Sequence, residues 1–385
     1  MTPQARAQAA IEILDEVVAA ARDAGAAADT IVQRYFKTRR YAGSKDRRAV
    51  RELVYAAIRR AGDLPKTGRA AMVALADERP EIGELFDGSP RGPEPISPEE
   101  PRAAAGVAPA WLGGRLDGLG LEARAPLDLR VNRLKARRED IRIEGAVPTP
   151  HALDGLRLPE GVQVEQLPEW ADGLIEVQDE GSQLVTLASG AKPGMTVIDL
   201  CAGAGGKTLG LAAAMENRGR LIASDADRSR LSRLSPRAER AGVSIAETQL
   251  LDGGREGEAL ADLRDQADLV VVDAPCSGTG TWRRNPEARW RLTQPRLDRV
   301  VALQARLLDV AARLVKPGGT LVHIVCSLLD EEGAGQAAAF LARHPGWVAR
   351  PVVLPTGEVR GPGIRLTPAA DGTDGFFVAT LVRPC

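Results

Sequence analysis

Residues 195–208 read MTVIDLCAGAGGKT, in which a short apolar run ends at Asp199 and leads into a glycine-rich turn. The final Gly-Lys-Thr resembles the end of a nucleotide-binding P-loop. A P-loop requires another glycine five positions before the glycine of this triplet, so that backbone amides can surround a phosphate. Cys201 occupies that position. We therefore expect the turn to bind something other than a phosphate group.

The pattern of an apolar run that ends on polar residues recurs after this turn, in GRLIASD, SIAETQLLD, ADLVVVDAP and GGTLVHIVCS. Residues 228–241 and 296–315, which lie between these runs, have helical patterns. This alternation predicts an α/β fold, with a mostly parallel, doubly wound sheet that has helices on both faces. Ligands of such folds bind beyond the carboxyl ends of the strands. The polar residues expected there are Asp199, Asp225, Asp252, Asp273, Cys276 and Cys326.

Four segments differ in composition along the chain. Residues 1–88 carry apolar side chains at helical spacing and predict a helical domain. Residues 89–101 are expected to form a linker, because the stretch DGSPRGPEPISPEEP contains five prolines, which interrupt helices and central strands. Residues 102–165 predict a small α+β region, and residues 166–385 predict the α/β domain.

The overall composition is that of a globular protein, with 44% hydrophobic residues, 27% charged residues and a net charge of -1. Four cysteines form no CxxC pair and only three histidines are present, which argues against a zinc or other metal site. The sequence shows no signal peptide and no apolar run of membrane length, so we expect a cytoplasmic protein with reduced thiols. A monomer is the default expectation.

Basic residues gather in three clusters. Residues 33–60 carry ten Lys or Arg against two acids, and residues 130–138 and 283–291 form two smaller clusters. A single cluster of this kind is usually a solvated surface. Three together favour a nucleic-acid partner.

The turn after Asp199 suits a nucleoside cofactor, because its glycines let the backbone approach a ligand and Asp225 can hold ribose hydroxyls. These features fit NAD and S-adenosylmethionine equally. The glycine order differs from the G-x-G-x-x-G of dehydrogenases, and a Pro-Gly-Gly turn before a late strand, as at 317–319, recurs in methyltransferases of this fold. We therefore favour S-adenosylmethionine. The residues expected to bind it are Cys201, Ala202, Gly203, Ala204, Gly205, Gly206, Lys207, Asp225, Asp252 and Asp273.

Two cysteines follow separate apolar runs, Cys276 within DAPCS and Cys326 within VCS. A single cysteine is most often a buried thiol. Two cysteines beyond strand ends and beside Asp273 indicate one reactive crevice instead.

These motifs resemble the RsmB/Sun-type RNA (cytosine-5) methyltransferases of the RsmB/NOP family, which share a Cys-Ala-x-x-Gly-Gly-Lys-Thr loop, an Asp-Ala-Pro-Cys-Ser loop and a later Thr-Cys-Ser. The resemblance covers residues 105–385 and includes LDLRVNRLKARRED, IEVQDEGSQL, RRNPEARW and DGFFVATLVRP. It implies a Rossmann-like class I methyltransferase domain. Residues 1–62 also resemble the helical RNA-binding domain of the antitermination factor NusB. The chain departs from the family pattern at Val325, at Gly203-Ala204 and in its short amino-terminal domain.

The resemblance implies a role for each site residue. Cys326 matches the nucleophile, which adds to carbon 6 of cytosine and thereby activates carbon 5. Asp273 would hydrogen-bond the base near N3, Cys276 would assist product release, and Lys207 would lie near the target base. That base must leave its stack to reach these groups. The NusB-like segment favours small-subunit (16S) rRNA over tRNA as the substrate.

Other interpretations remain open. A DNA cytosine-5 methyltransferase would use Cys276 as its nucleophile, but the second cysteine and the RNA-binding-like segment count against it. A dehydrogenase would leave both cysteines without a role. A non-catalytic RNA-binding or assembly factor of the same fold is a third alternative, and the complete set of Asp273, Cys276, Cys326 and Lys207 argues against a decayed site.

Overall fold

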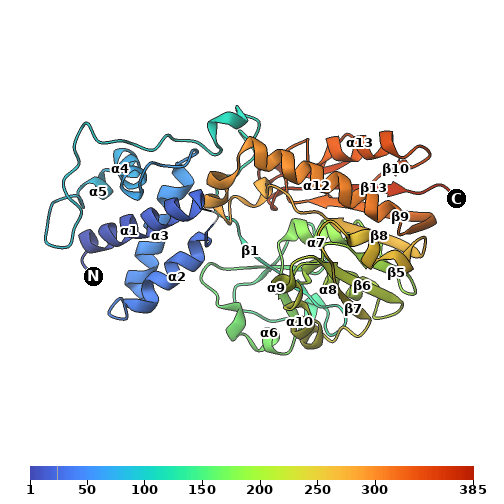
Figure 1. Ribbon diagram of the computed structural model, residues 1–385. Coiled ribbons are helices and arrows are strands. Elements are labelled where there is room, and N and C mark those ends of the chain that lie inside the picture. Colours follow the sequence, from blue (N-terminus) through green and yellow to red (C-terminus); the bar gives the residue numbers. More distant parts are fainter. Residues whose placement is uncertain (24) are drawn as a thin grey trace. The chain divides into compact units, whose positions relative to one another are not determined.

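The computed structural model describes residues 1–23 and 25–385, which form two compact units (Figure 1). Unit 1 comprises Met1–Arg124 and Thr281–Gln294, and unit 2 comprises Ala125–Gly280 and Pro295–Cys385. The segment Thr281–Gln294, which follows the DAPCS loop in the chain, thus belongs to unit 1. The four segments expected from composition stay a prediction.

Unit 1 is built from helices. They are α1 (Pro3–Arg22), α2 (Ala28–Thr38), α3 (Ser44–Arg60), α4 (Gly68–Glu78), α5 (Pro80–Gly83) and the 3-10 turns η1 (Ala110–Leu112) and η6 (Pro286–Arg291). The side chains of Thr2 and Thr67 accept hydrogen bonds from the backbone N–H three residues later and so cap α1 and α4. The apolar faces of α1 to α4 meet in one core, which includes Ile13, Leu14 and Ile58.

The segment Thr281–Gln294 places large side chains inside unit 1. Arg289 is fully buried, and its guanidinium donates hydrogen bonds to backbone carbonyls of this unit at 3.2 and 3.4 Å. Burial lowers the pKa of Arg289 to about 10. Trp290 packs in the helical core and donates its indole N–H to the carbonyl of Ala61 at 3.0 Å. Arg283 is also buried, so two arginines of the 283–291 cluster are not free surface charges as the sequence suggested.

Unit 2 contains two sheets. The smaller is antiparallel, has the order β2-β3-β1-β4, and consists of β1 (Leu127–Val131), β2 (Val147–Pro148), β3 (Gly155–Leu158) and β4 (Ile175–Val177). The larger has the order β11-β12-β13-β9-β8-β5-β6-β7, and β10 also pairs with β13. Its strands are β5 (Thr196–Asp199), β6 (Arg220–Asp225), β7 (Ala246–Leu250), β8 (Ala267–Asp273), β9 (Val315–Val325), β10 (Val348–Arg350), β11 (Glu358–Arg360), β12 (Gly363–Leu366) and β13 (Phe376–Val382).

Helices cover both faces of the larger sheet (Figure 1). Along β8, Val270 and Val272 pack in the core that includes residues of α12 and α13, whereas Leu269 and Val271 pack in the core that includes residues of α7 and α8. Both faces are therefore buried, as the continuous apolar runs of the sequence predict. The α-helices of unit 2 are α6 (Pro168–Ala171), α7 (Glu180–Leu187), α8 (Gly206–Ala214), α9 (Arg228–Leu231), α10 (Leu234–Ala241), α11 (Glu256–Ala259), α12 (Gln294–Ala312), α13 (Ala334–Arg343) and α14 (Pro368–Asp371). Its short 3-10 turns are η2 (Arg138–Asp140), η3 (Val164–Gln166), η4 (Ala261–Leu263) and η5 (Thr279–Thr281).

The parallel register brings three strand ends together. Asp199 of β5 lies opposite Val271 of β8, and Asp273 of β8 lies opposite Ile324 of β9. The carboxyl ends of β5, β8 and β9 therefore share one edge of the sheet, where the sequence predicts the site.

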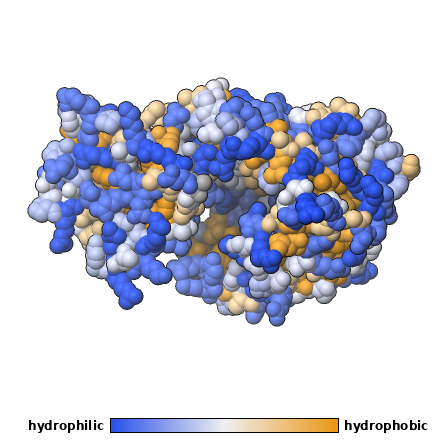
Figure 2. Space-filling view, in the orientation of Figure 1, coloured by the Kyte–Doolittle hydropathy of each residue, from blue (hydrophilic) through white to orange (hydrophobic). Residues whose placement is uncertain are grey.

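Hydrophilic residues dominate the visible surface, and hydrophobic residues show only in smaller patches between them (Figure 2). Within residues 1–23 and 25–385, no helix has both the length and the apolar character needed to span a membrane.

The buried segment of unit 1 leads to a stability prediction. Trp290→Ala should lower the free energy of unfolding by about 3–5 kcal/mol, because it leaves a cavity in the helical core. Urea titrations followed by far-ultraviolet circular dichroism measure this loss. Trp111→Ala is the matched control, since Trp111 also donates its indole N–H to a carbonyl of unit 1 but is 37% exposed. Equal losses in the two variants would contradict a core role for Trp290.

Candidate active site

The turn between β5 and α8 has a shape that requires glycine at two positions. Gly203 and Gly205 have φ values of +56° and +87°, in the left-handed region that side chains disfavour. A Cβ atom on Gly203 would lie 2.3 Å from the guanidinium of Arg230, and one on Gly205 would lie 2.7 Å from Leu234. Gly206, at the start of α8, faces open space. The turn is thus tightly packed on one side and open where α8 begins.

Carboxylates line this turn. Asp225 accepts hydrogen bonds from the backbone N–H groups of Gly203 and Asp227, each at 2.7 Å. Asp199 is fully buried and accepts a 2.7 Å hydrogen bond from the hydroxyl of Thr208. Burial raises the pKa of Asp199 to about 7, although this hydrogen bond opposes the shift.

Asp252 lies apart from the turn residues. It follows the edge strand β7, it is exposed, and its carboxylate forms no hydrogen bond or ion pair within the described part of the chain. Its predicted role in cofactor binding stays a prediction.

A lysine and an aspartate form an ion pair at the shared strand edge. The Nζ atom of Lys207 lies 2.8 Å from a carboxylate oxygen of Asp273. Burial by itself would lower the pKa of Lys207, but the charge and hydrogen bond of Asp273, together with negative charge on Cys326, raise it. Lys207 therefore carries a positive charge beside both groups at neutral pH.

The two predicted cysteines come together at the same edge. The sulfur atoms of Cys276 and Cys326 are 3.3 Å apart, and both side chains are partly exposed. The hydrogen bond to Cys326 and burial raise the pKa of the Cys276 thiol well above its ordinary value. Cys276 is therefore a protonated thiol that can donate its S–H to the sulfur of Cys326.

Two glycines let the loops behind the cysteines approach closely. The backbone N–H of Gly280 donates to the carbonyl of Cys326 at 3.1 Å, and the N–H of Gly375 donates to the carbonyl of Gly280 at 2.8 Å. A Cβ atom on Gly280 would lie only 2.0 Å from the carbonyl oxygen of Gly375. Three segments of unit 2 therefore meet here through their backbones.

Comparison with known proteins gives the family. The model of the family described as 16S rRNA methyltransferase RsmB/F matches residues 186–382. The chain belongs to the RsmB/F family. Ribosomal RNA small subunit methyltransferase B of Pectobacterium atrosepticum is 34% identical over 80% of this chain and 75% of its own length.

Two solved structures resemble this RsmB/F family member. The crystal structure of PH0851 is 25% identical, covers 97% of this chain and 98% of its own chain, and has a TM-score of 0.74. A methyltransferase homolog protein from Pyrococcus horikoshii is 28% identical, covers 70% of this chain and 90% of its own, and has a TM-score of 0.59. These findings confirm the predicted fold class and the methyltransferase class.

The cofactor turn of this RsmB/F protein fits S-adenosylmethionine, which membership of a methyltransferase family supports. One carboxylate oxygen of Asp199 is buried and has no hydrogen-bond partner within residues 1–23 and 25–385. Each oxygen of Asp225 still has a lone pair beyond its one backbone donor. Two carboxylates beside an open backbone turn suit a ligand with cationic groups and ribose hydroxyls.

The predicted absence of a metal site stays a prediction. Within the described ranges, no group of three or more His, Cys, Asp or Glu side chains could hold a metal ion.

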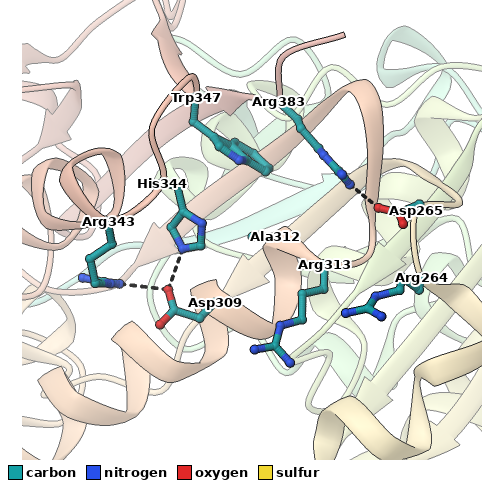
Figure 3. Close-up of a pocket in the computed structure, with 9 residues that line it drawn as sticks. All are labelled: Arg264, Asp265, Asp309, Ala312, Arg313, Arg343, His344, Trp347 and Arg383. Atoms are coloured by element: carbon teal, nitrogen blue, oxygen red, sulfur yellow. Dashed lines mark hydrogen bonds and ion pairs between the residues drawn. The ribbon is translucent and has the colours of Figure 1, made fainter.

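A cavity of about 580 Å³ lies at the opposite edge of the larger sheet (Figure 3). It is lined by Arg264, Asp265, Ala312, Arg313, Asp309, Arg343, His344, Trp347 and Arg383. Asp265 and Arg313 precede the starts of β8 and β9, whereas the cysteines follow the ends of these strands. Asp265 pairs with Arg383, and Asp309 pairs with Arg343 at 3.1 Å. The cavity contains no thiol, so we place the chemistry at the cysteine edge.

Three further residues contribute to the site and were not among the predicted ones. The ring of Phe376 lies 5.4 Å from Nζ of Lys207, close enough for a cation–π contact. Arg237 donates a 2.6 Å hydrogen bond to the carbonyl of Ala204 in the cofactor turn. Glu332 lies beneath the cysteine loops and is fully buried. The sequence offered a signal only for Phe376, which belongs to the quoted DGFF motif.

The raised pKa of Asp199 predicts a pH-dependent stability. An unfolded aspartate ionises near pH 4, so between about pH 4 and 7 the folded chain holds a proton that the unfolded chain has released. Stability from this group is therefore present at low pH and lost as the pH rises through about 7. Asp199→Asn cannot ionise. The difference between its free energy of unfolding and that of wild type should therefore increase by about 4 kcal/mol, in favour of the variant, between about pH 4 and pH 7.

Urea unfolding of both proteins without cofactor, at pH values between about 4 and 8, tests this expectation. Other titrating groups contribute equally to the two curves and cancel in their difference. Parallel curves would mean that Asp199 is already ionised in the folded protein.

Proposed function

We propose that the chain is an S-adenosylmethionine-dependent RNA (cytosine-5) methyltransferase that forms 5-methylcytidine in small-subunit (16S) rRNA. The observation that supports this most is the 3.3 Å approach of Cys326 and Cys276 beside the Lys207–Asp273 ion pair. A methyltransferase that acts on a nucleophilic nitrogen or oxygen atom needs no pair of thiols. Carbon 5 of cytosine does need a thiol, because it is a poor nucleophile until carbon 6 is attacked.

Cys326 would supply that attack. Its thiolate forms a bond to carbon 6, and the electron pair of the 5,6 double bond becomes available at carbon 5. S-adenosylmethionine supplies the sulfonium methyl group that carbon 5 takes. Lys207, whose ammonium lies 2.8 Å from Asp273, also interacts electrostatically with Cys326.

Asp273 and Lys207 would orient the base. Cytosine gains electron density at N3 and O2 when a thiolate adds to carbon 6, so a proton donor or a cation near these atoms stabilises the adduct. The ammonium of Lys207 would be this cation, and the Asp273 carboxylate that it contacts at the end of β8 is fixed in direction before the base arrives. The base must leave its stack to reach these residues.

Cys276 would act after methyl transfer. Carbon 5 then carries both a hydrogen and the new methyl group, and the product forms when this proton leaves and the Cys326–carbon 6 bond breaks. The two electrons of the C–H bond restore the double bond, and those of the S–C bond return to Cys326. The Cys276 thiol, 3.3 Å from Cys326, is suited to support this release.

The cofactor would be held by the turn from Cys201 to Lys207, with Asp199 beside its amino-acid end and Asp225 at its ribose. Asp273 would lie between the cofactor and the base. The basic helices of unit 1 are the expected RNA contact, and we place this activity in the cytoplasm and on a monomer. A tRNA substrate is the second candidate, and a non-catalytic RNA-binding factor is the third.

Methyl transfer from labelled S-adenosylmethionine to unmodified 16S rRNA tests this proposal. Wild type should form labelled 5-methylcytidine, and Cys326→Ala should lower the rate by more than about 10³-fold, because carbon 5 is no longer activated. Cys276→Ala should accumulate a covalent RNA–protein adduct, since release from Cys326 is blocked. Nucleoside analysis and denaturing gels measure these results.

Cys385→Ala is the matched control, because this cysteine is exposed near the end of the chain and should leave methylation unchanged. An adduct that survives Cys326→Ala but not Cys276→Ala would mean that the two roles are reversed. Incorporation of the labelled methyl group into tRNA alone would mean that the substrate is tRNA. RNA binding with no label in any RNA would favour the non-catalytic factor.

A further inference from the structure

A buried carboxylate lies under both cysteine loops. Glu332 follows β9, and its side chain has no solvent exposure. It accepts hydrogen bonds from the backbone N–H of Ser277 at 2.7 Å and from the side-chain amide of Gln304 at 3.0 Å. The hydroxyls of Ser277 and Ser327 also donate to it. Ser277 directly follows Cys276, and Ser327 directly follows Cys326.

This carboxylate has no cationic partner within residues 1–23 and 25–385, although Lys and Arg are abundant in the chain. Burying a charge without an ion pair costs free energy, which hydrogen bonds to the charged form offset. An ionised carboxylate has two oxygens that only accept, so it can satisfy one backbone N–H, one amide and two hydroxyls together. Four donors from three separate segments thus converge on Glu332.

The backbone alone does not fix the cysteines. The parallel ladder between β8 and β9 ends at Asp273 and Ile324, and one further bond joins the N–H of Ala274 to the carbonyl of Ile324 at 2.9 Å. Cys276 lies beyond this point. Its loop is held by the contacts of Ser277, by the bond from the N–H of Gly280 to the carbonyl of Cys326, and by the amide of Gln304, which also donates to the carbonyl of Pro275 at 2.9 Å.

The loop that carries Glu332 is itself anchored. The Nε2 atom of His323, in β9, lies 2.8 Å from the carbonyl oxygen of Glu332. Burial lowers the pKa of His323 to about 4, so its ring is neutral at pH 7. Since a carbonyl can only accept, Nε2 must carry the single ring proton. This bond ties Glu332 back to the strand that ends beside Cys326.

We propose that Glu332 is a positioning residue that sets the distance between the two cysteine sulfurs by holding the serine that follows each one. The inference rests on the proposed function for its catalytic readout, but the sulfur distance can be measured without catalysis. Glu332 hydrogen-bonds to neither thiol, so its proposed positioning role acts through Ser277 and Ser327.

Two substitutions separate this role from general stability. Glu332→Ala removes all four hydrogen bonds and should lower kcat about 100-fold, with KM for RNA changed less than about threefold, because a displaced catalytic group loses rate rather than binding. Glu332→Gln should stay within about fivefold of the wild-type kcat. Its amide oxygen can still accept from Ser277 and Gln304, and its amide N–H groups can donate to serine hydroxyls that rotate.

Asp371→Ala is the matched control. Asp371 is a buried carboxylate of unit 2 that accepts hydrogen bonds from Thr367 N–H at 2.7 Å and from the Thr356 hydroxyl at 2.6 Å. Its loss should lower the melting temperature but leave kcat unchanged below that temperature. If Asp371→Ala and Glu332→Ala lower kcat equally, the effect is general destabilisation and the proposal is wrong.

A second readout needs no methyl transfer. Diamide converts two neighbouring thiols to a disulfide, while its own N=N bond is reduced to a hydrazine by the two electrons and two protons released. Peptide mass spectrometry then measures the Cys276–Cys326 disulfide. Wild type and Glu332→Gln should form it readily, and Glu332→Ala should form it at least about tenfold more slowly, because the sulfurs are no longer held together.

The two readouts distinguish the possible failures. Absence of methylation by wild type overturns the proposed function, while the disulfide rates still decide the role of Glu332. Disulfide formation in Glu332→Ala at the wild-type rate overturns the positioning role. A kcat for Glu332→Gln as low as that of Glu332→Ala also overturns it, because the charge and not the set of hydrogen bonds would then matter.

Discussion

The site depends on the parallel pairing of β8 with β9. Parallel strands that are hydrogen-bonded in register end at the same edge of the sheet, so the residues that follow them are neighbours although they lie 50 positions apart in the chain. Asp273 ends one strand, and Cys326 follows the other. The neighbouring parallel strand β5 brings Lys207 to the same edge through the turn and α8. An antiparallel β9 would place Cys326 at the far edge, beside the arginine-lined cavity of Figure 3.

Because the side chains at this edge are buried, the pKa of each ionisable group depends strongly on whether it has a charged partner. Lys207 is only 8% exposed, and such a lysine would lose its proton more easily if Asp273 did not lie 2.8 Å away. Asp199 shows the opposite result, because Thr208 supplies a hydrogen bond but no charge, and its pKa rises to about 7. Asp273 is thus paired with a cation, whereas Asp199 has a pKa near neutrality and can lose its proton when a cationic ligand binds.

Much of this site could be predicted from the sequence, because strand-end residues follow from a simple pattern. An apolar run that ends on Asp or Cys predicts a buried strand with its functional residue at the carboxyl end, and Asp273, Cys276, Cys326 and Lys207 do lie together. Asp252 fits the same pattern but lies exposed after the edge strand β7. The local sequence does not reveal the order of strands in the sheet, so this difference could not be predicted.

Glu332 could not be predicted either. DEEG reads as a polar turn, and only the tertiary fold buries one of its acids. The position of Trp290 in the helical core of unit 1 likewise depends on contacts between segments that are distant in the sequence.

The arrangement of charges distinguishes the two thiols, although both follow strand ends. Lys207 interacts electrostatically with Cys326, and negative charge there raises the pKa of the lysine. The pKa of Cys276 is raised by its hydrogen bond to Cys326, by burial and also by the charge of Glu332. Within this pair the S–H proton therefore belongs to Cys276. An enzyme in which the Pro-Cys thiol attacks the base would need the reverse, with a cation near Cys276 and no carboxylate behind it. The charge distribution of unit 2 thus supports the proposal that the thiol that follows β9 is the nucleophile.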